Sequence, residues 1–125
     1  MMNAINWFEI PAIDLERAFT FYATILHNNV RKGTFGNGEL ILFNVPFQTG
    51  EAVGGSIVVR EGFNPTMDGP LLFINAFGKL SDATDKVEIS GGKVLVPFID
   101  LGEFGFASII VDSEGNKIGL LSIEK

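Results

Sequence analysis

The chain has 125 residues, with 15 acidic and 9 basic side chains and a formal net charge of −6 at neutral pH. That length corresponds to one ordinary domain and excludes an enzyme with a separate cofactor domain. Hydrophobic residues make up 46% of the chain, which predicts a compact core, whereas the acidic balance excludes a basic surface for nucleic acid.

Cysteine is absent from the sequence, which excludes disulfides, thiolate zinc sites and a cysteine nucleophile. The N-terminus has no basic segment followed by an apolar run, and no stretch approaches the ~20 apolar residues that a membrane span requires. We therefore expect a cytoplasmic protein without a membrane partner.

The residue pattern predicts two successive units, each with the element order βαβββ. Large apolar residues alternate over residues 5–10 and Pro11 ends the run, as in a strand. Asp14 is the expected N-cap of an amphipathic helix whose apolar stripe continues to Leu26, with His27 in a surface or capping role at its end. The other predicted elements are strands at 30–35, 39–45, 54–60, 71–77, 94–98, 105–111 and 117–123, a helix at 81–90, and hairpin turns at 36–38 and 112–116.

A fixed offset of 65 residues relates the two halves, pairing Phe8 with Phe73 and Gly54 with Gly119. We therefore predict an α+β fold in which two tandem βαβββ modules form an open, curved, mixed sheet of half-barrels around a cleft. The predicted boundaries are a single domain at 1–125, a first module at 5–60, a linker at 61–70 and a second module at 71–123.

Two stretches carry a family resemblance. The first is WFEIPAIDLERAFTFY at residues 7–22; the second combines GGKVLVP at 91–97, GFA at 105–107 and DSEGNKIGL at 112–120. Together they resemble the glyoxalase/bleomycin-resistance/extradiol-dioxygenase superfamily, also called vicinal oxygen chelate proteins. Its members include lyases, dioxygenases, epimerases and non-catalytic drug-binding proteins, so the resemblance implies a fold rather than one activity.

In metal-dependent members of that superfamily, each module supplies a His from its first strand and a Glu from its last. On this chain the first-strand positions fall on Trp7 and Leu72, and the last-strand positions fall on Gly54 and Gly119. None of these side chains can bind a divalent ion. We therefore expect no metal and no cofactor, and no metal-dependent glyoxalase or dioxygenase activity.

Alternation along the first strand places Trp7 and Glu9 on the cleft side, and Phe8 and Ile10 toward the helix. A carboxylate beside an indole and away from water is a candidate general base, or a binding group for a cationic ligand; the alternative is a partly solvated residue bonded to a neighbour. Asn75 is expected on the helix-facing side as a structural amide. The predicted ligand-binding residues are Trp7, Glu9, Phe43, Ser56, Leu72, Phe98 and Phe106.

Three hypotheses for function remain open. The first is a metal-independent small-molecule-binding protein of the glyoxalase/bleomycin-resistance type, with aromatic compounds among the candidate ligands. The second is a lyase or isomerase of the same superfamily that uses Glu9 as a base or holds a metal at unexpected positions. The third is a partner-binding module whose cleft is filled by Trp7 and its neighbours. Unpaired sheet edges and the resemblance together predict a homodimer.

Overall fold

The computed structural model describes residues 2–36 and 38–125; Asn37, at the centre of a predicted hairpin turn, lies outside the described residues. The described elements repeat the predicted βαβββ order. They are β1 (Trp7–Pro11), α1 (Leu15–Ile25), β2 (Val30–Phe35), β3 (Gly38–Phe43), β4 (Gly54–Val58), β5 (Phe73–Asn75), α2 (Leu80–Thr84), β6 (Lys93–Asp100), the short 3-10 helix η1 (Gly102–Phe104), β7 (Phe106–Val111) and β8 (Lys117–Ser122).

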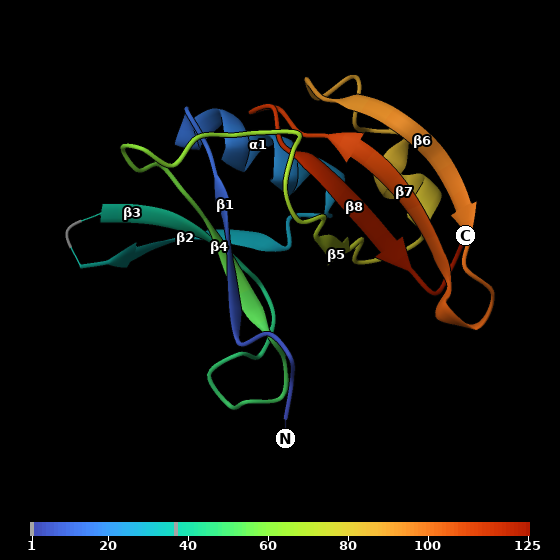
Figure 1. Ribbon diagram of the computed structural model, residues 1–125, viewed down its shortest axis with the longest axis horizontal. Coiled ribbons are helices and arrows are strands. Elements are labelled where there is room, and N and C mark those ends of the chain that lie inside the picture. Colours follow the sequence, from blue (N-terminus) through green and yellow to red (C-terminus); the bar gives the residue numbers. More distant parts are fainter. Residues whose placement is uncertain (1, 37) are drawn as a thin grey trace.

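Each module forms its own four-stranded mixed sheet. The strand orders are β1-β4-β3-β2 and β5-β8-β7-β6. The neighbours β1 and β4 run parallel, and so do β5 and β8. Figure 1 shows the first sheet on the left and the second on the right. The predicted α+β class and the duplication of the module are therefore confirmed.

Helix α1 forms as its sequence predicts. The Asp14 carboxylate accepts a hydrogen bond from the Arg17 N–H at 3.0 Å, which caps the first turn. Ala18, Tyr22 and Ile25 are buried on one stripe. The chain leaves the helix through His27 and Asn28, which both have positive φ, and His27 is exposed at this end.

Helix α2 is shorter than predicted, because it ends at Thr84 rather than at residue 90. The backbone N–H groups of Lys86 and Val87 bond to carbonyls three residues earlier, so the chain continues as tight turns. Its N-cap, Lys79, makes no side-chain capping bond. Val87 is nevertheless buried, so the turns place the predicted apolar side chain in the core without a full helix.

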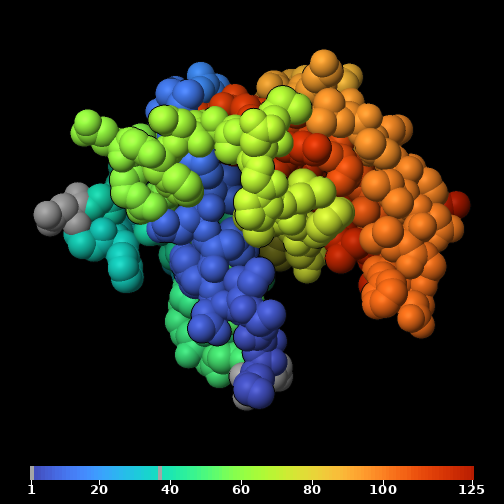
Figure 2. Space-filling view, viewed as in Figure 1, coloured from blue at the N-terminus to red at the C-terminus, as the bar shows by residue number. Residues whose placement is uncertain are grey.

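One hydrophobic core joins the two modules. Ile10 and Tyr22 from the first module belong to the same buried cluster as Leu80 and Ile110 from the second. Residues 61–70 connect the modules, and Figure 2 shows this yellow-green stretch crossing the face of the molecule between the two halves. Among the described residues, no helix is long and apolar enough to cross a membrane.

The second module departs from the predicted register by one residue. Trp7 pairs with Gly54, but it is Phe73, not Leu72, that pairs with Gly119. A shift of one residue moves a side chain to the other face of a sheet. Asn75 consequently lies on the exposed face with Phe73, and its predicted place on the helix-facing side is wrong.

Candidate functional site

One face of the first sheet forms an apolar cup of about 430 Å³. In the register of the sheet, Glu9 on β1 lies beside Ser56 on β4, and Ser56 lies beside Leu42 on β3. The opposite face carries the buried core residues Ile10 and Ile57. The cup is lined by Trp7, Glu9, Thr34, Phe35, Leu40, Leu42, Phe47 and Ser56.

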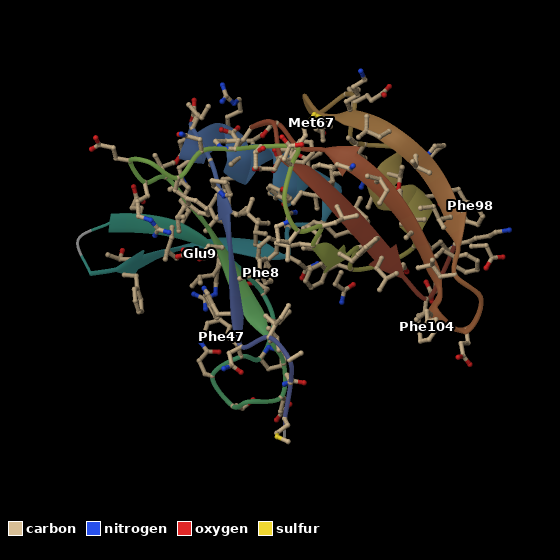
Figure 3. The ribbon with its side chains drawn as sticks, viewed as in Figure 1. Phe8, Glu9, Phe47, Met67, Phe98 and Phe104 are labelled. Atoms are coloured by element: carbon tan, nitrogen blue, oxygen red, sulfur yellow. The ribbon has the colours of Figure 1, made fainter. Side chains whose placement is uncertain are left out.

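Trp7, the first residue of β1, lines the cup and is 39% exposed. Its indole N–H lies 3.4 Å from the Ser56 hydroxyl, a long hydrogen bond. The ring of Phe47 meets the indole edge to face, with centroids 5.1 Å apart and planes at 82°. Phe47 comes from the irregular loop between β3 and β4, and Figure 3 shows it on the same side of β1 as Glu9, with Phe8 on the other side.

Aromatic rings cover both glycines that the family resemblance places at last-strand metal positions. A Cβ on Gly54 would lie 2.9 Å from the Phe47 ring, and a Cβ on Gly119 would lie 2.4 Å from the Phe73 ring. No group of three or more His, Cys, Asp or Glu side chains gathers anywhere in residues 2–36 and 38–125. The residues present therefore do not fit a metal ion at these positions.

Glu9 reaches the cup as a partly solvated residue bonded to a neighbour, which is the alternative that the sequence left open beside a desolvated carboxylate. Its side chain is 38% exposed, and Arg60 donates to both of its carboxylate oxygens. The guanidinium of Arg60 also lies over the ring of Phe63, with 5.0 Å between its central carbon and the ring centroid. Glu9 is thus half of a surface ion pair at the rim of the cup.

Four of the seven predicted ligand-binding residues lie outside the cup. Phe43 is on the core face of β3, where it is 4% exposed and packs against Tyr22. Phe98 and Phe106 stack on each other in the second module, 5.5 Å apart, and Figure 3 shows Phe98 far from Phe47. Leu72 is half-buried beside Phe8 under the linker. The structure brings Trp7, Glu9 and Ser56 together.

The sequence prediction missed four apolar lining residues. Leu40 and Leu42 alternate with the core residue Ile41 along β3, so strand periodicity assigns them to the face opposite the core. Phe47 and Phe35 carry no such signal, because one lies on an irregular loop and the other at the end of an edge strand.

A second group of functional-looking side chains forms what we call the seam: the turn Asp112–Asn116 of the second module, packed against the start of α1. Oδ1 of Asp112 accepts the backbone N–H groups of residues 114, 115 and 116, and Oδ2 accepts the Tyr22 hydroxyl at 2.5 Å. Asn116 bonds across to the Pro11 carbonyl at 2.7 Å. Burial, followed by the charge of Asp112, raises the pKa of Tyr22 well above its ordinary value, so the phenol stays protonated as a donor.

Glu114 completes the seam, and its side chain is fully buried. It accepts hydrogen bonds from the backbone N–H groups of Ile13 and Asp14 and from the Arg17 guanidinium. Burial by itself raises the pKa of Glu114, but the bonds from Arg17, Asp14 and Ile13 outweigh it and hold the pKa below the ordinary value. With every described buried side-chain polar atom bonded, the seam is structural.

Comparison with solved structures identifies the arrangement of the sheets. A glyoxalase/bleomycin resistance protein from Albidiferax ferrireducens superposes with a TM-score of 0.67 and 16% identity over 95% of this chain and 98% of that one. The chain has the glyoxalase/bleomycin-resistance superfamily fold. A fosfomycin resistance protein, FosX, from Listeria monocytogenes shares this fold, with a TM-score of 0.60 and 12% identity over 100% of this chain and 93% of that one. That structure holds Mn(II) and a dihydroxypropylphosphonic acid.

Two curated relatives, both named as glyoxylases, are longer than this chain. The mycobacterial protein named "Putative glyoxylase CFP32", from Mycobacterium bovis and Mycobacterium tuberculosis, is 26% identical over 115 residues. The match covers 92% of this chain but only 44% of the relative, so the chain spans less than half its length. No family model matches the chain.

Proposed function

We propose that this glyoxalase-like domain binds a small, neutral, apolar molecule in the cup, without a metal ion. The observation that carries the proposal is the composition of the cup: Leu40, Leu42, Phe47 and Trp7 line a hollow on the face of the sheet opposite the core. Such a face in an antiparallel region ordinarily carries polar side chains, and uncovered apolar hollows mark binding sites. The Glu9–Arg60 pair is neutral overall and gives the cup little preference for a charged ligand.

The structure offers no support for the alternative in which Glu9 acts as a general base. Both of its carboxylate oxygens already accept hydrogen bonds from Arg60. The seam supplies no replacement, because the carboxylates of Asp112 and Glu114 are fully engaged in holding the turn and the helix start.

The test is a titration with N-phenylnaphthylamine, a neutral dye that fluoresces in apolar surroundings. Leu42→Asn places an amide in the cup, and we expect it to weaken dye binding about ten-fold, since that corresponds to roughly 1.4 kcal/mol of lost apolar contact. Ile89→Asn is the matched control, because Ile89 is 88% exposed in the turns that follow α2 and belongs to neither sheet. Equal affinity in the two variants would contradict the proposal.

We also propose that two copies of the chain pair, with the second sheet of one copy closing the cup of the other. The face of the second sheet that carries Phe73 is apolar across its full width, because Phe73, Gly119, Ile109 and Val96 are neighbours in register. Phe73 is 47% exposed and Val96 38% exposed. Sedimentation should show a dimer at high micromolar concentration and a shift toward single chains for Phe73→Glu; a wild-type protein that sediments as one chain would contradict the pairing.

A further inference from the structure

The ring of Phe47 fastens the loop between β3 and β4 to the cup. At the start of the loop, the Val45 N–H bonds to the carbonyl of Phe43, the last residue of β3. The other bonds of the described residues 45–53 stay inside the loop: Phe47 N–H to the Val45 carbonyl, Gly50 N–H to the Phe47 carbonyl and Thr49 hydroxyl to the Pro46 carbonyl. The ring of Phe47, by contrast, packs on Trp7 and lies directly over Gly54. The ring of Phe47 thus anchors the centre of the loop to β1 and β4, whereas the backbone bonds attach the start of the loop to β3.

Gly54 makes this seat possible. The three atoms nearest to a Cβ at that position all belong to Phe47, at 2.9 to 3.0 Å, which is closer than a side chain tolerates. The flat backbone of Gly54 and the indole of Trp7 thus form a two-sided seat for one aromatic ring. The contact that Phe47 makes there is edge to face, with centroids 5.1 Å apart and planes at 82°, a geometry that aromatic pairs favour.

We infer that Phe47 is an internal stand-in for the ligand, and that the Trp7–Gly54 seat takes an aromatic ring which displaces it. This inference rests on the proposed function and names the ligand class. The exchange replaces one aromatic contact with another. Within the described residues the backbone bonds of Phe47 and Gly50 stay inside the loop, so moving the ring breaks no backbone bond from the centre of the loop to β1 or β4. Phe47 is then a specificity-determining side chain that excludes ligands without a ring able to compete for the indole edge.

The test uses two probes of similar size that differ in aromaticity, benzyl alcohol and cyclohexylmethanol. Trp7 is the single tryptophan of the chain, so its fluorescence reports directly on the seat. Removing the stand-in with Phe47→Ala should tighten benzyl alcohol binding about two- to ten-fold, the range that one aromatic contact corresponds to. Binding of cyclohexylmethanol should gain less.

Gly54→Ala tests the seat itself, because a methyl group there would lie 2.9 to 3.0 Å from a ring held where the Phe47 ring lies. It should expel Phe47 and also exclude the ring of benzyl alcohol, so it should abolish the gain in affinity when combined with Phe47→Ala; a gain that survives in the double variant would overturn the seat. Phe104→Ala is the control for loss of an exposed ring, since Phe104 is 71% exposed on η1 of the other module. Melting curves of all variants check that each one folds.

The outcomes separate the two ideas. Weaker or unchanged benzyl alcohol binding in Phe47→Ala would show that Phe47 is a fixed wall and would overturn the inference while leaving the proposed function intact. Equal gains for both probes would overturn the aromatic preference. Absence of binding of either probe, and of N-phenylnaphthylamine, to every variant would overturn the proposed function itself and the inference with it.

Discussion

The seam and the cup lie at opposite ends of β1 and use polar groups in opposite ways. At the seam, the buried carboxylates of Asp112 and Glu114 bind backbone N–H groups, a phenol, an amide and a guanidinium, and no described buried side-chain polar atom is left without a partner. In the cup, the polar contact of Trp7 is a 3.4 Å bond to Ser56, and the rest of the lining is mainly apolar and uncovered. A saturated polar network fixes geometry and has nothing left to offer a ligand, whereas an uncovered apolar hollow contributes little to folding and remains free to bind.

The largest expected effect is on the seam. We expect Asp112→Ala to lower the free energy of unfolding by about 3–5 kcal/mol, because Tyr22, Asn116 and three backbone N–H groups lose a buried acceptor at once. Urea unfolding measures the loss. Asp100→Ala removes an exposed aspartate that bonds a single N–H, that of Gly102, and should cost about 1 kcal/mol or less. Similar losses for the two variants would remove the distinction between seam and surface.

A smaller, pH-dependent effect is expected at Glu114. Glu114→Gln should cost about 1–3 kcal/mol at neutral pH, because bonds to a charged acceptor are replaced by bonds to a neutral one. The native pKa of Glu114 lies below its ordinary value, so this stability is fully present above the unfolded pKa of about 4.3 and is lost as pH falls through the native pKa. The difference between wild type and variant in urea unfolding should therefore shrink on acidification. A difference that stays constant down to strongly acidic pH, or a similar effect of the exposed Glu103→Gln, would argue against this role.

At the rim of the cup, Glu9→Gln should change the free energy of unfolding by about 0.5 kcal/mol or less, because the pair with Arg60 is exposed on both sides. The affinity for N-phenylnaphthylamine should also stay unchanged, since a neutral dye gains nothing from the carboxylate. Thermal melting and dye titration check both expectations. A fall of several degrees in the melting temperature would show that Glu9 is a structural group like those at the seam. A loss of dye binding would show that the Glu9 carboxylate takes part in the binding site.

The smallest expected effect is that of divalent ions. Ligands that bind only the folded state raise its melting temperature, and Mn²⁺ or Zn²⁺ at millimolar concentration should leave it unchanged, because aromatic rings lie over Gly54 and Gly119. Elemental analysis of the purified protein after mild chelation provides the second measurement. Stoichiometric metal located near Gly54 would show that the cup is a metal centre after all.

Strand alternation was sufficient to assign Trp7, Glu9 and Ser56 to one face, because that rule is local and β1 and β4 keep their register. It was not sufficient for Phe43, Phe98 and Phe106, because the sequence pattern of a large aromatic residue is the same whether its side chain lines a pocket or packs in a core. Leu72 and Asn75 were misplaced by the single-residue register shift, which the fixed offset of 65 could not reveal.

By itself, the sequence determined the order of elements, the duplication, the cap at Asp14 and the hairpin geometry of Asp112–Asn116, since each depends on residues that are close together in the chain. The tertiary structure decided what those residues do. Asp112 is a turn residue locally, but its second oxygen holds Tyr22, 90 positions earlier in the chain; Glu9 is a strand carboxylate locally, but Arg60, 51 positions later, neutralises it. Burial and charge pairing depend on which residues are neighbours in space. These neighbours come together only when the two modules pack on one core.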